Sequence, residues 1–287
     1  MKIHKRHVGM VAWLLIAGPG LKTANAQLPM AKDAPELGYF ALLMEKKLKF
    51  GINTEGGIEI QPLNREKNAE GELLKIEPLI VETLPGGSEV PRMLVANTLE
   101  TKEAPAARLT RTSFRGKADN DAAMEVSVEA SRGVIFLGGR ILEKGQSINP
   151  QHVGFAIPMH HVYTGDTNRI AEIENAEEKE EEQKAFMKKT RNDSISLRLA
   201  GGKRLKYKMQ EPIEPLNEKI KGVAIEQVEL EYAAYPDHKF LFTAAPNSEI
   251  ALVAGNGSPL HTALSIHWKA NPEKDPEGKA RLALQVK

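Results

Sequence analysis

The side chains that could do chemistry are scattered along this chain, and only one group of them stands close together. The segment from Pro158 to Asp166 carries His160, His161 and the Asp166 carboxylate. Two imidazoles and a carboxylate are a donor set that zinc and related ions accept. Adjacent residues on a strand point to opposite faces, so His160 and His161 converge only where the backbone is irregular. We therefore predict no metal site, and we interpret this segment as an edge strand or an exposed loop.

Two further histidines and a tryptophan lie near the C-terminus. His261 and His267 share the polar positions of a strand predicted over 260–268, but six extended residues separate them by about 20 Å, too far to act together. Trp268 takes the apolar parity of the same strand. We expect it in the core, with His267 on the opposite face; a sugar-stacking platform is the alternative.

The sequence signatures of common active sites are missing. There is no Gly-x-Ser-x-Gly nucleophile turn, no Gly-x-x-x-x-Gly-Lys phosphate loop and no dinucleotide glycine motif. The absence of cysteine excludes thiol catalysis, disulfides and thiolate metal sites. A pair of carboxylates from distant strands remains compatible with glycoside hydrolysis, although only 5% of the residues are aromatic. We predict no catalytic, cofactor-binding or metal-binding residues.

The first 26 residues have the pattern of a cleavable secretion signal. A positively charged start precedes an apolar run over Val8–Ala17, which is shorter than a membrane-spanning helix, and the Ala-Asn-Ala sequence at 24–26 suits a signal peptidase. We expect a mature chain that begins at Gln27 and resides in the periplasm, on the cell surface or outside the cell. An N-terminal membrane anchor is the alternative.

Charge narrows the range of partners. The leader holds four cations and no acid, so its removal changes the formal net charge from +1 to −3. A weakly acidic protein lacks the basic face that nucleic-acid binding needs. We also expect no membrane span in the mature chain, and no cofactor.

Apolar and polar side chains alternate with period two along most of the mature chain, which predicts about a dozen strands. Thr54-Glu55-Gly56-Gly57 predicts the turn of a hairpin. The run Gly133–Leu142 is apolar enough for a strand buried on both faces. The parity changes near Glu226-Gln227, which predicts a β-bulge. Basic residues at Arg204, Lys206 and Lys208 are interpreted as a solvated strand face that discourages edge pairing.

One segment departs from this pattern. Arg169–Lys189 carries apolar residues at helical spacing, and seven glutamates with one lysine lie between Glu172 and Glu182. We predict a solvated acidic helix that is anchored only at its ends, because burying so many like charges would be costly. A docking surface or a weak cation site is the alternative. The segment has no glycine for a calcium-binding loop.

These features predict an all-β protein of immunoglobulin-like β-sandwich architecture with one acidic surface helix. We expect two sandwich units, residues 27–165 and 190–287, joined by the helical linker 166–189. One large sandwich with the helix as an excursion is the alternative. In its signal peptide, short alternating strands and missing catalytic motifs, the chain resembles secreted and pilus-associated immunoglobulin-like proteins.

That resemblance implies a non-enzymatic exported protein: a cell-surface, adhesion or pilus-type subunit that works through protein partners or self-assembly. The alternative is a carbohydrate-active enzyme or glycan-binding module on a β-sandwich. A cleft with two carboxylates about 5–10 Å apart would favour hydrolysis, whereas an apolar or strand-edge patch would favour assembly.

Overall fold

The computed structural model describes residues 27–287 except 33–37, 65–68, 71–72 and 272; the predicted signal sequence thus lies outside the described residues. The strands are β1 (Tyr39–Met44), β2 (Leu48–Asn53), β3 (Ile58–Asn64), β4 (Ala69–Glu70), β5 (Leu74–Thr83), β6 (Glu89–Met93), β7 (Arg111–Lys117), β8 (Ala123–Ser131), β9 (Val134–Glu143), β10 (Gln151–Pro158), β11 (Ser194–Leu199), β12 (Arg204–Lys208), β13 (Ile225–Glu231), β14 (Lys239–Ala244), β15 (Ser248–Val253), β16 (Ser265–Ala270) and β17 (Arg281–Val286). The helices are the 3-10 helix η2 (Met159–Tyr163), α1 (Thr164–Glu172), α2 (Ala176–Lys189), α3 (Glu214–Ile220) and α4 (Leu260–Ala263).

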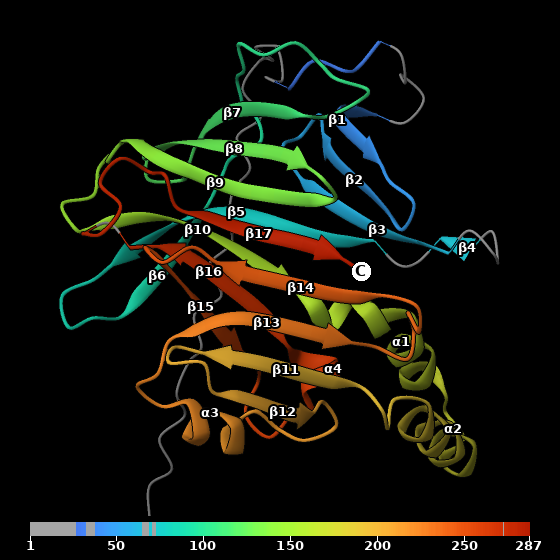
Figure 1. The fold of residues 1–287 in the computed structure, drawn as a ribbon. Helices are drawn as coiled ribbons and strands as arrows, with labels where there is room; N and C mark the ends of the chain where they lie inside the picture. The colour runs from blue at the N-terminus through green and yellow to red at the C-terminus, as the bar shows by residue number, and fades with distance from the viewer. Residues whose placement is uncertain (1–26, 33–37, 65–68, 71–72, 272) are drawn as a thin grey trace, which may run out of the picture.

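The strands form two antiparallel layers, one in front of the other in Figure 1. Sheet A has the order β1-β2-β3-β5-β10-β16-β15, and the short strands β4 and β6 pair with β3 and β5. Sheet B has the order β7-β8-β9-β17-β14-β13-β11-β12. The pair of Ile225 in β13 with Ile250 in β15 connects the two sheets. The all-β prediction is confirmed.

The expected division into two sandwich units does not describe this topology. Strands from both halves of the chain pair with each other in each layer, because β10 pairs with β16 in sheet A and β9 pairs with β17 in sheet B. One buried cluster runs from Leu28 to Val286. The arrangement is the single large sandwich that the sequence left as the alternative, and it has more strands than an immunoglobulin-like domain.

The strand buried on both faces is β10, whose eight residues are all buried. The sequence prediction placed such a strand at Gly133–Leu142 instead, whereas β9 is buried mainly along one face. The apolar run Val153–Ile157 is the sequence feature that indicates β10. Strand β1 was also missed, because its six residues follow a proline-containing, polar stretch.

Several local predictions are confirmed. The hairpin of β2 and β3 turns through Gly56, whose φ of 79° lies in the left-handed region that glycine adopts without strain. The pairing of β11 with β13 changes register beside Glu226, as the parity change predicted. Trp268 is 1% exposed and its ring lies 5.5 Å from that of Phe155 on the adjacent strand.

Truncating Trp268 should therefore be costly. We expect Trp268→Ala to lower the free energy of unfolding by about 3–5 kcal/mol, because it leaves a cavity between the sheets. The exposed Val253, on the adjacent strand β15, provides the control: Val253→Ala should change stability by less than about 0.5 kcal/mol. Urea denaturation followed by circular dichroism measures both. Equal, small effects would place Trp268 outside the core.

Candidate functional site

The outer faces of the two sheets differ in how their charges are arranged. On sheet B, charged side chains of neighbouring strands neutralise one another. Glu125 binds Arg115 and Arg140 at 3.1 and 3.2 Å, and Lys239 contacts both Glu229 and Glu231. Such cross-strand pairs are typical of a sheet face that meets water. A hollow at its β7 edge is bordered by this same Arg115–Glu125 pair.

The outer face of sheet A has an apolar floor instead. Leu79, Val81 and Ala156 form a small buried cluster that is separate from the core between the sheets. Gly154 lies beneath it: a Cβ there would come within 2.9 Å of Leu79 and 3.0 Å of Val81. The partly exposed Val253 continues this floor on β15. Small and apolar side chains thus occupy the centre of this face.

A hollow of about 130 Å³ opens over this floor. We call it the second hollow; the first hollow, also bordered by β5, is described below. The walls of the second hollow are formed by β5, β6, β10, β15 and β16, which lie side by side in sheet A. The lining residues are Leu79, Val81, Glu89, Phe155, Glu249, Ala251, Val253, His267, Trp268 and Lys269. Residues from positions 79 to 269 meet here only because β10 brings the two halves of the chain together.

A lysine between two carboxylates borders the second hollow. The Lys269 ammonium donates to Glu89 and, at 2.9 Å, to Glu249. Burial lowers the pKa of Lys269, but the hydrogen bonds to the two carboxylates outweigh it, so this pKa lies above its usual value. Lys269 is therefore cationic at neutral pH.

Two imidazoles lie close to this trio. His267 is half-buried on the outer face, and burial holds its pKa below 6.5 although Glu77 and Glu89 oppose that effect. His152 is 6% exposed; burial and the charge of Lys269 lower its pKa. Its Nε2 atom lies 4.0 Å from Glu89 and has no hydrogen-bond partner among the described residues. Both rings are mainly neutral at pH 7.

The first hollow, of about 260 Å³, adjoins the second along β5. Outer-face side chains of β3 and β5 line it, including Glu59, Lys75 and Glu77, and the segment 93–99 closes one side. Glu59 accepts hydrogen bonds from Tyr39 and Asn53 at 2.8 and 3.0 Å. Together the two hollows, which we call the outer-face groove, are lined by five glutamates and two lysines. The groove is acidic with an apolar floor.

The carboxylate pair of this groove is poorly arranged for glycoside hydrolysis. Glu89 and Glu249 bind the same lysine nitrogen, so their oxygens lie within two hydrogen-bond lengths of each other. The ammonium occupies the point between them, where the glycosidic oxygen would sit. The scissile bond therefore cannot lie between the two carboxylates, as hydrolysis requires. The strongly exposed large apolar side chains of the described residues also include no aromatic ring for sugar stacking.

The histidine pair considered for a metal lies elsewhere. His160 and His161 belong to the 3-10 helix η2 rather than to a strand or loop, and their rings are 4.3 Å apart. The Asp166 carboxylate is held by Lys189 at 2.8 Å, and His161 contacts Thr164 at 3.3 Å. No group of three potential metal ligands occurs within the described ranges.

His261 belongs to α4 and not to the predicted strand, which begins at Ser265. It is 1% exposed and contacts the Met209 carbonyl at 2.9 Å. Burial lowers its pKa. The separation of His261 from His267 therefore has a different cause from the one predicted: one ring lies within the core and the other on an outer face.

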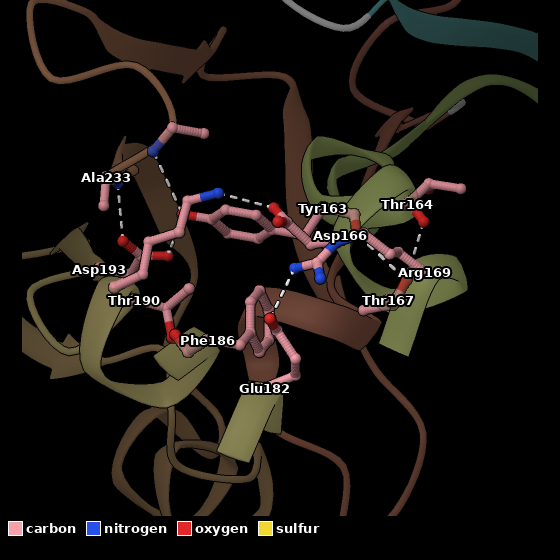
Figure 2. A network of polar contacts seen from close by, with 12 residues as sticks. Tyr163, Thr164, Asp166, Thr167, Arg169, Glu182, Phe186, Thr190, Asp193 and Ala233 are labelled. Atoms are coloured by element: carbon pink, nitrogen blue, oxygen red, sulfur yellow. Dashed lines mark hydrogen bonds and ion pairs between the residues drawn. The ribbon is translucent and has the colours of Figure 1, made fainter. Parts of the chain in front are cut away.

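A buried polar network fixes the helical excursion to the sandwich (Figure 2). The Tyr163 hydroxyl donates to Asp193 at 2.8 Å, and Asp193 also accepts the Ala233 backbone N–H. Burial raises the pKa of Asp193, and these two hydrogen bonds oppose that effect. Phe186 of α2 packs edge-on against Tyr163. Tyr163 and Asp193 are buried, and none of these four residues borders the hollows above.

The acidic segment forms two helices rather than one. The first ends at Glu172 with Ile173 as its C-cap. Asn175 caps the second, because its side chain accepts the backbone N–H groups of Glu177 and Glu178. Arg169 of α1 binds Glu182 of α2 at 2.8 Å (Figure 2). As predicted, the glutamates of α2 are exposed, except that Glu182 is half-buried. The expected anchoring at the C-terminal end is weaker than predicted, because α2 has no buried residue and Met187 is 41% exposed.

The comparisons with known proteins give little guidance. No family model matches the sequence, and no curated protein matches it. Similar solved structures include a bacterial glucoamylase complexed with acarbose, which is 6% identical with a TM-score of 0.44. The alignment covers 94% of this chain and 34% of that one, so the chain spans about a third of its length. Similarity at this level supports no conclusion about activity. Within the described residues, no helix is long and apolar enough to cross a bilayer.

The acidic helices give one test. We expect Glu174→Gln, Glu177→Gln and Glu181→Gln together to change the free energy of unfolding by less than about 0.5 kcal/mol, because all three side chains are exposed. Tyr163→Phe should instead lower it by about 1–3 kcal/mol, since Asp193 loses a buried partner. Chemical denaturation compares the two. A large loss in the triple variant would show that the glutamates make contacts beyond those described.

Proposed function

We propose that this chain is an exported interaction protein whose outer-face groove holds a segment of a protein partner. The observation that supports this most strongly is the contrast between the sheets. Sheet B neutralises its outer charges internally, whereas sheet A leaves an apolar floor and an excess of glutamates. An accessible apolar surface with a polar rim is typical of a contact surface for another molecule.

The chemistry of the groove defines the kind of segment that fits it. The exposed Ala251 and Val253 offer contacts to apolar side chains beside the buried Leu79 and Val81. Glu77 lines the first hollow, and in the described structure its carboxylate accepts no side-chain hydrogen bond, so it is available to a cation. The partner segment therefore combines apolar and cationic side chains. We place the interaction outside the inner membrane, as the predicted leader implies.

A peptide with alternating leucine and lysine residues tests the groove directly. We expect it to bind the purified mature chain in fluorescence anisotropy. Ala251→Arg should weaken binding at least tenfold, because the arginine fills the second hollow and adds a positive charge that repels the lysines of the peptide. Ala283→Arg is the matched control, because Ala283 lies on the outer face of sheet B. It should leave binding unchanged.

Two outcomes would contradict the proposal. Equal loss of binding in both variants would mean that the peptide binds nonspecifically to acidic surface. Tight binding of a neutral oligosaccharide such as maltoheptaose, abolished by Ala251→Arg while the peptide has no effect, would favour the glycan-binding alternative. Turnover of that sugar that is lost in Glu77→Gln would favour an enzyme.

A further inference from the structure

The connection from β9 to β10 presents one isoleucine almost completely to solvent. Ile148 is 95% exposed, more than any other large apolar side chain of the described residues. An isolated exposed apolar residue on a mobile loop would need no explanation. This loop, in contrast, is fixed in place on both sides of Ile148.

The residues that flank Ile148 are bound to a buried carboxylate. Ser147 and Asn149 donate side-chain hydrogen bonds of 2.5 and 2.7 Å to Glu82, which is 4% exposed at the end of β5. Arg92 donates two further bonds of 3.0 Å to the other carboxylate oxygen. The Asn149 backbone N–H also donates to Ser147. The side chains of Ser147 and Asn149 thus point towards the protein, whereas Ile148 between them points towards solvent.

The start of the loop is equally constrained. Gln146 donates from its side chain to Asp121 and from its backbone to Asn120, at 2.7 and 2.9 Å. Gly145 has a φ of 58°, and a Cβ at this position would come within 2.2 Å of the Ala122 backbone nitrogen. No other residue fits there without displacing the chain. Ile148 is therefore held in one position before any contact forms, which reduces the entropy lost on binding.

We propose that Ile148 is the anchor of a symmetric contact between two copies of this chain, in which each Ile148 enters the second hollow of the other copy. The loop enters sheet A beside this hollow, since the Thr83 backbone N–H donates to the Pro150 carbonyl and His152 pairs with Val81. An anchor that lies next to its own receptor site suits a two-fold arrangement, in which the same surface of both copies is buried.

Charge supports the same partner. Residues 144–149 contain one cation, Lys144, and no acid. The rim of the second hollow has two glutamates, Glu89 and Glu249, for the single Lys269. An apolar side chain accompanied by a lysine is also the kind of segment that the groove was argued to hold, so this inference rests on the proposed function.

The oligomeric state of the mature chain provides the test. We expect light scattering after size-exclusion chromatography to give the monomer mass at low micromolar concentration and twice that mass near millimolar concentration. Ile148→Asp should shift the midpoint of this transition at least tenfold towards higher concentration. Val223→Asp is the control, because Val223 is also exposed but lies in the turn after α3. Ile148→Leu should retain the dimer.

The outcomes separate this inference from the proposed function. The chain could stay monomeric at every concentration and still bind the leucine–lysine peptide in a manner sensitive to Ala251→Arg. That result would overturn the self-association and would leave the groove as a site for another protein. A dimer that is unaffected by Ile148→Asp also overturns it. A monomer that does not bind the peptide contradicts both proposals.

The Glu82 cluster also makes the stability of this loop depend on pH. Hydrogen bonds from Ser147 and Asn149 outweigh burial and, with Arg92, lower the pKa of Glu82 to about 2, compared with 4.5 for the unperturbed group. The folded state therefore holds this proton more weakly than the unfolded chain. The stabilisation is complete above about pH 4.5 and is lost as the pH falls towards 2.

We therefore expect the difference in unfolding free energy between the wild type and Glu82→Gln to be largest at neutral pH and to shrink between about pH 4.5 and 2. Glu129→Gln, at an exposed position on β8, should show little difference at any pH. Denaturation curves across this range measure it. A difference that stays constant down to pH 2 would show that Glu82 is not held as a low-pKa carboxylate.

Discussion

The pairing of β10 with both β5 and β16 is the constraint on which the rest of this structure depends. It joins an early strand to a late one, and it makes a single sandwich of a chain whose halves each have the length of a small domain. β10 can occupy this central position because its eight residues are all buried, with apolar side chains towards the core and Gly154 and Ala156 towards the outer face. The same strand supports the candidate site, because Leu79 and Val81 pack over Gly154 and line the second hollow.

The sequence predicted local structure more successfully than long-range structure, and the reason is physical. Alternation of side chains reports one face of one strand, so it identified the β2–β3 hairpin, the bulge at Glu226 and the buried position of Trp268. It contains no information on which strand is the neighbour. The division into two units failed because nothing in the periodicity of β9 or β10 indicates a partner more than a hundred residues away.

The candidate site was missed for the same reason. Glu77, Ala156 and Ala251 are unremarkable in sequence, and His267 was considered only in relation to His261. They become a site because the registers of three strand pairs place them in one row on the outer face of sheet A. The histidine pair at 160–161 is adjacent in sequence, but it lies in η2 at the start of the helical excursion and not in the candidate site. Helical spacing of apolar residues does not show the break between α1 and α2, because that break depends on Asn175 acting as an N-cap.

The central claim is that sheet A, and not sheet B, presents the interaction surface. Methyl NMR spectra of the mature chain, recorded over a wide range of protein concentration, test it most directly. The account predicts that the resonances of Ile148, Ala251 and Val253 shift together as concentration rises, whereas Ala283 on sheet B does not move. Shifts confined to Ala283 and its neighbours, or no concentration-dependent shift at Ala251 together with none on addition of the leucine–lysine peptide, would contradict it.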